Sequence, residues 1–134
     1  MPGMIREIEL PLHTDERGKL VPVEFDSAIP FEVKRTYYIW GVPSGVVHGG
    51  CAYTEEKNVF FCIRGRCHAH ISTDGSTPAK IVLHSPNRGL FVDNLVWHEF
   101  SDFSPDAILL CFSSTNYLPD NHIRSFEEFK KVVQ

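Results

Sequence analysis

Two short segments of the sequence place side chains that can exchange protons on one side of a strand. Cys51 and Tyr53 are two residues apart, as are Arg35 and Tyr37, so each pair shares a face if its segment is extended. His98 adds an imidazole, a group whose ordinary pKa of about 6.5 suits it to accept and return a proton at neutral pH. A phenol, with an ordinary pKa of about 10, is a better acid than base unless a cation lowers its pKa. These residue types would support proton transfer.

Each of these groups also has a purely structural interpretation. Cys51 is more often a small core residue, and no feature of the sequence shows a lowered thiol pKa. Tyr53 is as readily explained by packing as by lining a pocket. His68 and His70 alternate along another segment, and we expect them to face solvent. The carboxylates of the segment 54–57 are expected to lie in a solvated loop.

Short apolar or alternating runs, separated by turn residues, recur along the chain. The runs are 7–10, 19–25, 34–40, 46–53, 58–63, 67–73, 80–84, 89–92, 96–100 and 107–113. Glycine and proline between them supply the backbone angles that tight turns need. Many short strands with closely spaced turns predict a β-sandwich or barrel. Only the tail, 125–133, has a helical pattern, with Ser125 as its N-cap and Glu128 completing a capping box.

Size and composition narrow the classes of protein. The 134 residues fit a single domain spanning 1–134. A net charge of -4 argues against nucleic acid as the main partner. No apolar run is long enough to cross a membrane or to act as a secretion signal. The four cysteines form no CxxC pair, so we expect reduced, mostly buried thiols in a cytoplasmic protein.

Three sets of motifs go beyond a generic β-domain. They are DERG at 15–18, KRTYYIWGVP running into GVVHGG across 34–50, and SPNRGLFV followed by VWHE across 85–99. Together, in order and over nearly the whole chain, they resemble the sugar 3,4-ketoisomerase family. This resemblance implies an all-β double-stranded β-helix of the cupin (jelly-roll) type, followed here by the short C-terminal helix.

The resemblance also implies an activity. The enzymes of this family move the keto group of a 4-keto-6-deoxyhexose linked to thymidine diphosphate (dTDP) from C4 to C3, through an enediol. They use neither metal nor redox cofactor. The product enters deoxyamino-sugar biosynthesis, for example for a lipopolysaccharide or an antibiotic. By analogy, the strands carrying Tyr37, Tyr53, Cys51 and His98 converge inside the barrel as the catalytic groups.

The substrate's diphosphate needs cationic partners. The candidates are Arg17, Arg35, Arg88 and His48, because guanidinium groups bind phosphate through two parallel hydrogen bonds. His48 stands where the family has an arginine, which makes it a weaker candidate. The resemblance further implies a homodimer, and we expect the segment 5–10 to pair with a partner subunit because small barrels of this kind have exposed edge strands.

The chain departs from the family at its central motif. The family typically has Arg-Gly-x-His-Ala-His, whereas positions 48–53 read HGGCAY, so Cys51 and Tyr53 replace the two histidines. Against the general cupin metal motif, Asn58 also replaces an acidic ligand, and His98 alone of the four expected ligands remains. A transition-metal site needs three or four suitable ligands, so we predict no metal here.

Three functions remain open on this scaffold. The first is the ketoisomerase, with its acid/base set rebuilt around His98 and the tyrosines. The second is a divergent epimerase that acts next to the ketone of a related nucleotide sugar. The third is a non-catalytic domain that binds a nucleotide sugar and assists a partner enzyme. Loss of the motif histidines favours the last two, while the surrounding strands predict an occupied pocket in all three.

Overall fold

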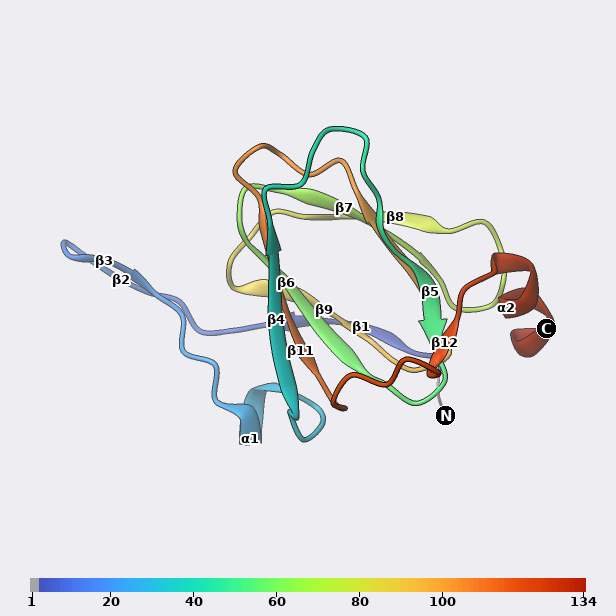
Figure 1. Ribbon diagram of the computed structural model, residues 1–134. Helices are drawn as coiled ribbons and strands as arrows, with labels where there is room; N and C mark the ends of the chain where they lie inside the picture. The colour runs from blue at the N-terminus through green and yellow to red at the C-terminus, as the bar shows by residue number, and fades with distance from the viewer. Residues whose placement is uncertain (1–2) are drawn as a thin grey trace.

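Alternating buried and exposed side chains along short segments build two antiparallel sheets that face each other (Figure 1). The computed structural model describes residues 3–134. One sheet has the strand order β1 (Ile5–Glu9), β9 (Arg88–Val92), β6 (Asn58–Arg64), β11 (Ile108–Ser113) and β4 (Arg35–Trp40). The other has the order β12 (His122–Ile123), β5 (His48–Tyr53), β10 (Trp97–Ser101), β7 (Cys67–Ser72) and β8 (Ala79–Leu83). The prediction of a mostly β protein is confirmed.

The two sheets do not close into a barrel. The edge strands are β1 and β4 in the first sheet, and β12 and β8 in the second. The sandwich is therefore open on two sides. Side chains of β1, β8 and β9 line a cleft on one side, and side chains of β4, β5 and β12 line a pocket on the other.

The main core fills the space between the sheets. Phe60, Phe100 and Leu109 are among its buried members, and burying one such side chain contributes about 1.5–3 kcal/mol. Along β7, the buried residues alternate with His68 and His70, which lie on the outer face of their sheet. The expected outward orientation of these two histidines is confirmed.

A second apolar cluster covers the outer face of the first sheet. Val59, Phe61, Phe91 and Phe112 project from that face and pack against the segment 21–33. The strand predicted over 19–25 is wrong beyond Leu20. Pro22 lacks the N–H that a strand ladder needs, so β3 (Gly18–Leu20) ends and one helical turn, α1 (Phe25–Ala28), follows. Strands β2 (His13–Asp15) and β3 form an exposed hairpin that projects from the sandwich (Figure 1).

The predicted C-terminal helix is present as α2 (Phe126–Val133). The Ser125 side chain accepts a hydrogen bond from the Glu128 backbone N–H at 3.3 Å, which caps the first turn. Phe129 is fully buried against Trp97 and Ala52, so the helix is held on the second sheet. This contact also fixes the approach of β12, which precedes the helix directly.

Strand β1 pairs with β9 of the same chain, with Ile5 opposite Val92. Its other edge has no strand beside it among residues 3–134. Pairing of this segment with a second subunit therefore stays a prediction. The four cysteines are buried and unpaired, as expected. No helix in the described part of the chain is long and apolar enough to cross a membrane.

Candidate active site

The pocket on the open side between β4 and β12 gathers most of the predicted chemistry. It has a volume of about 340 Å³ and is lined by Arg35, Tyr37, Tyr53, Tyr117 and His122. An inner cavity of about 180 Å³ lies beyond it, and both spaces share Tyr37 and Tyr53 in their walls. The two phenols therefore stand between the pocket mouth and the interior of the sandwich.

Strand geometry explains this arrangement. On β4, Arg35 and Tyr37 are half-buried toward the pocket while Tyr38 and Trp40 are exposed, which is the period of two expected of a strand. On β5 the register places Cys51 opposite His98 of β10, with a bulge just after His98. The predicted convergence of these strands is what the structure shows.

Gly49 is required where β5 passes β10. Its φ is +83°, and a Cβ at this position would lie only 3.0 Å from the His98 carbonyl oxygen. Any other residue would be strained there and would push the strands apart. The glycine thus allows His98, which lines the inner cavity, and Cys51 to lie side by side. Cys51, predicted as a catalytic group, lines neither the inner cavity nor the pocket.

His98 is almost fully buried, with 2% of its surface exposed. Its Nδ1 lies 3.2 Å from the Val96 carbonyl oxygen, which can only accept, so Nδ1 carries the hydrogen. Its Nε2 faces the Cys51 sulfur at 3.9 Å, and the Tyr53 ring lies 5.1 Å away. Burial lowers the pKa of His98 to about 4. The imidazole is therefore neutral near pH 7.

The thiol and the two phenols around His98 are held in their protonated forms. Burial raises the pKa of the Cys51 thiol to about 11 and moves the pKa of Tyr53 well above its usual range. Burial also raises the pKa of Tyr37, with further contributions from Cys111 and Tyr53. Tyr37 and Tyr53 line the pocket and can donate hydrogen bonds to an oxygen there, while all three groups are poor bases.

Arg35 makes a buried ion pair at the pocket wall. Its Nη2 lies 3.2 Å from the Glu56 carboxylate, which is 1% exposed and also accepts a 2.9 Å hydrogen bond from Thr115. The guanidinium packs over the rings of Tyr37 and Tyr117, at 5.4 and 5.8 Å. Its Nε is buried and has no hydrogen-bond partner among residues 3–134. The expectation of a solvated carboxylate at Glu56 is wrong, because Arg35 and Thr115 compensate its burial.

His122 lines the pocket mouth and was missed by the sequence reasoning. It pairs with Tyr53 across β12 and β5, and the two rings meet edge to face with centroids 4.8 Å apart. Its Nδ1 lies 3.2 Å from the Pro119 carbonyl oxygen. No motif surrounds His122 in the sequence, so only its long-range pairing with Tyr53 reveals its place.

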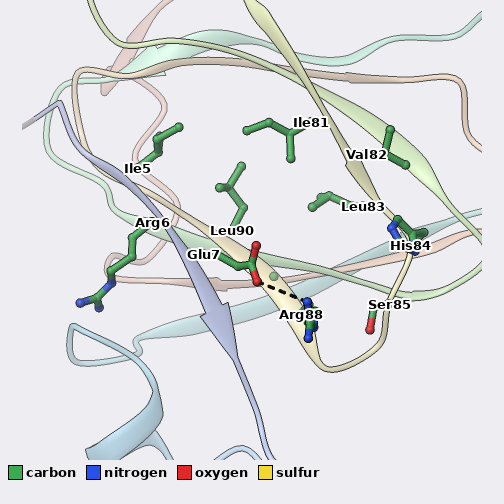
Figure 2. A pocket seen from close by; sticks show the side chains of 11 residues that line it. Ile5, Arg6, Glu7, Ile81, Val82, Leu83, His84, Ser85, Arg88 and Leu90 are labelled. Carbon is green, nitrogen blue, oxygen red and sulfur yellow. Dashed lines mark ion pairs between the residues drawn. The ribbon is translucent and has the colours of Figure 1, made fainter.

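The other predicted binding residues are dispersed. His48 lines the inner cavity, with its ring 5.8 Å from that of Phe103. Arg17 lies on the exposed hairpin and pairs with Asp15 at 2.7 Å. Arg88 lines the cleft on the opposite side of the sandwich, which has a volume of about 350 Å³ (Figure 2).

That second cleft combines an apolar wall with charged and polar side chains, among them Glu7, His84 and Arg88. Figure 2 shows Ile81, Leu83 and Leu90 between the strands, with Arg88 directed toward Glu7. Arg88 also lies 3.5 Å from the Glu9 carboxylate. The structure does not bring Arg17 or Arg88 to the pocket that holds Arg35.

The residues at the cupin metal positions do not form a donor set for a metal. Tyr53 and Asn58 offer a phenol and an amide, which are not among the usual ligands of zinc, so Cys51 and His98 are the two remaining donors at these positions. The side-chain oxygen of Asn58 accepts from the Cys111 thiol at 3.3 Å. His98 is the one remaining imidazole of the expected set. The prediction of no metal at this site thus rests on the chemistry of the donors.

Comparison with known proteins gives consistent relatives. A family model described as "FdtA: WxcM-like, C-terminal" matches residues 4–134. A relative from Aneurinibacillus thermoaerophilus, named TDP-4-oxo-6-deoxy-alpha-D-glucose-3,4-oxoisomerase, is 38% identical over 119 residues, which cover 89% of this chain and 85% of that protein. A 3,4-ketoisomerase structure from Helicobacter canadensis superposes with a TM-score of 0.91 at 33% identity, covering 96% of both chains.

A further structure carries a bound sugar nucleotide. It is a mutant of the 3,4-ketoisomerase QdtA from Thermoanaerobacterium thermosaccharolyticum in complex with TDP-4-keto-6-deoxyglucose, with a TM-score of 0.92, 28% identity and coverage of 96% and 93%. Sugar epimerases are more distant. The NovW epimerase from Streptomyces spheroides has a TM-score of 0.73 at 22% identity, covering 88% of this chain and 67% of that one, and so shares the fold alone.

Proposed function

The chain belongs to the FdtA family (WxcM-like, C-terminal), and we propose that it is an isomerase of a dTDP-linked 4-keto-6-deoxyhexose. It moves the keto group from C4 to C3 by acid/base proton transfer, as a step of deoxyamino-sugar biosynthesis. The proposal includes the finer fold assignment, a double-stranded β-helix of the cupin type, which the ketoisomerase neighbours support.

One observation carries the proposal. Tyr37 and Tyr53 stand in the wall shared by the pocket and the inner cavity, and the half-buried guanidinium of Arg35 packs over Tyr37 in the same pocket. Two phenols held protonated beside a fixed cation suit a ketone oxygen that becomes negatively charged during enolisation. Moving a keto group to the neighbouring carbon requires this stabilisation at both oxygens in turn.

The nucleotide diphosphate would lie at the pocket mouth. Within the described part of the chain the buried Nε of Arg35 has no hydrogen-bond partner, and its planar fork is suited to phosphate or to a sugar oxygen. Tyr117 is exposed at the same mouth and offers an aromatic face to a base or a sugar. We assign Arg35 to the substrate and treat Arg17, Arg88 and His48 as secondary candidates, because they do not line this mouth.

The proposed reaction needs no cofactor. The isomerisation is redox-neutral, since one carbon is oxidised as its neighbour is reduced within the same sugar. Proton transfer and hydrogen bonding to oxygen therefore suffice. Tyr37, Tyr53 and His98 line the place where they would occur, and Cys51 lies behind His98. We further propose a cytoplasmic homodimer in which β1 contributes to the subunit interface.

Isotope exchange with a defined substrate tests the function. The protein is incubated with TDP-4-keto-6-deoxyglucose in deuterated water and the sugar is followed by NMR. We expect a 3-keto product with deuterium at C4. Deuterium next to a ketone that stays at C4 would instead show an epimerase.

The same experiment separates the non-catalytic alternative. A protein that leaves the sugar unlabelled and unchanged, yet binds it saturably, would be a nucleotide-sugar-binding domain. A protein that neither labels nor binds the sugar would overturn the nucleotide-sugar assignment as well. Boiled protein is the control for spontaneous exchange at carbons next to the ketone.

A further inference from the structure

The buried side chains in and behind the pocket wall do not include an effective base. Cys51, Tyr37 and Tyr53 are held protonated by burial, and the pKa of buried His98 is depressed to about 4. The Nε2 of His98 is also directed at the Cys51 sulfur rather than at open space. Abstraction of a proton from carbon needs a group that can accept it at neutral pH and release it again.

His122 occupies the position that such a group requires. It comes from β12, lines the pocket with Arg35 and both phenols, and is half-buried rather than enclosed. The edge-to-face contact with Tyr53 and a ring centroid 6.3 Å from that of Tyr117 hold the imidazole in the wall.

One hydrogen bond sets the tautomer of His122. The Pro119 carbonyl oxygen can only accept, so Nδ1, at 3.2 Å, carries the hydrogen. The lone pair is then on Nε2, for which no hydrogen-bond partner is present among residues 3–134. A backbone carbonyl on one imidazole nitrogen is a usual means of orienting the other for proton transfer or ligation.

We propose that His122 carries the proton between C3 and C4 of the sugar, in place of the imidazoles that Cys51 and Tyr53 have replaced. This assignment rests on the proposed function. Nε2 takes the C3 proton, the C–H bonding pair forms the C3=C4 bond, and a phenol protonates the C4 oxygen. The C3 hydroxyl then returns a proton to that phenolate. The hydrogen on Nε2 exchanges with solvent at the open pocket mouth and is delivered to C4, leaving the ketone at C3 and solvent hydrogen at C4.

The test removes the imidazole and supplies it again from solution. We expect His122→Ala to isomerise roughly 10²–10⁴-fold more slowly than the parent. Added imidazole should restore part of the rate, a result that a merely structural role would not give. Thymidine diphosphate should raise the melting temperature of His122→Ala by about as much as that of the parent. This result would show that the variant's pocket is intact. His84→Ala, at an exposed histidine in the opposite cleft, is the control and should keep full activity.

A second variant keeps the test decisive if His122→Ala does not fold. His122→Gln retains a hydrogen-bonding side chain and should be similarly slow, without rescue, because its amide still fills the site. Either variant isomerising within threefold of the parent would overturn the role of His122 and leave the ketoisomerase assignment standing. An inactive parent that exchanges no deuterium would overturn both.

A separate cluster on the outer face of the second sheet has the composition of a metal site. His68 and His70 of β7 and the carboxylate of Asp102 place one ligand atom each within 4.8 Å of the others. His68 Nδ1 lies 3.1 Å from the carboxylate, and Asp102 has a left-handed backbone with φ of 53°. Two imidazoles and a carboxylate form a donor set suited to zinc.

From this geometry we infer a site for zinc or a similar divalent transition metal, independent of the pocket. Calorimetric titration of the purified chain with zinc chloride should show one site per chain. His68→Gln and Asp102→Asn should each weaken the affinity roughly tenfold or more, while His84→Gln leaves it unchanged. Parent and His68→Gln proteins that take up equal amounts of zinc would overturn the inference.

Discussion

Arg35 and Glu56 form an ion pair in which the carboxylate is the more deeply buried member. Their atoms are 3.2 Å apart, and the side chains are 22% and 1% exposed, respectively. A buried carboxylate without its cation is strongly destabilising, whereas the intact pair contributes little by itself. The pair therefore couples the stability of the fold to a residue that we assign to the substrate.

Replacing Arg35 should accordingly lower stability as well as binding. We expect Arg35→Ala to lower the free energy of unfolding by about 3 kcal/mol, measured by urea denaturation, because Glu56 loses its buried partner. Glu56→Gln should cost less, since the amide oxygen can still accept from Thr115. An Arg35→Ala protein as stable as the parent would mean that water or another cation compensates Glu56.

Thymidine diphosphate should bind at the mouth that Arg35 lines and raise the melting temperature by mass action. Arg35→Lys keeps a positive charge beside Glu56 but loses the planar fork, so we expect it to weaken binding by about 1.5–3 kcal/mol. Arg88→Ala should change the titration little, because Arg88 lies in the opposite cleft and pairs with Glu7 and Glu9. Equal losses in the two variants would show that the nucleotide spans both sites.

The buried imidazole of His98 predicts a loss of stability in acid. Its pKa is about 4 in the folded chain and about 6.5 when unfolded, so the unfolded state binds more protons between these values. The contribution of His98 to the free energy of unfolding is complete above about pH 6.5 and is lost as the pH falls toward 4. The total loss should be about 3 kcal/mol. Urea midpoints measured between pH 4 and 7.5 should show this slope, and His98→Asn should flatten it.

The two residues that replace the family histidines should differ in importance. Tyr53→Phe removes a donor beside the substrate and should slow isomerisation roughly 10²-fold or more, as loss of one oxyanion donor does. Cys51→Ser should have little effect, because the thiol contacts the buried His98 and is protonated. Rates of product formation for the single variants test this order.

The double variant Cys51→His, Tyr53→His restores the family pattern. We expect an active parent, with the double variant retaining activity through a second route. Activity confined to the double variant would contradict the assignment and show that the natural chain has given up the reaction. Activity of the parent that survives both Tyr53→Phe and His122→Ala would place the acid and the base elsewhere.

The molecular mass of the protein in solution tests the proposed homodimer. Light scattering at micromolar concentration should give about twice the 15.3 kDa of one chain. The backbone hydrogen bonds at Met4 and Leu10 face β9, so by alternation the Glu7 N–H faces the free edge of β1. Glu7→Pro should shift the protein toward the monomer if that edge pairs with a second copy. A parent that scatters as a monomer would contradict the dimer directly.

The sequence was most informative where structure is local. The alternation along β7 predicted which side chains are buried, and Ser125 predicted the start of α2, because a strand face and a helix cap depend on neighbouring residues. The motifs around Tyr37 and His98 predicted that their strands converge, which the register of β5 with β10 confirms for His98.

The remaining features depend on contacts between distant parts of the chain. Glu56 was placed in solvent because its partner Arg35 is 21 residues away in the sequence and nothing local marks a buried carboxylate. His122 was missed since its role depends on pairing between β12 and β5. The suitability of His98 as a base was overestimated, because the sequence does not show how completely that imidazole is buried.

The positions of the two sheet edges have a kinetic consequence. In the first sheet, β1 and β4 are opposite edges, so a second copy joined along β1 would approach the side away from the pocket. Substrate bound in the pocket of one subunit would then leave the shape of the other subunit's pocket mouth unchanged. Saturation curves for the assembled enzyme should be hyperbolic, with a Hill coefficient of about one, since no element bordering the mouth would also border the interface.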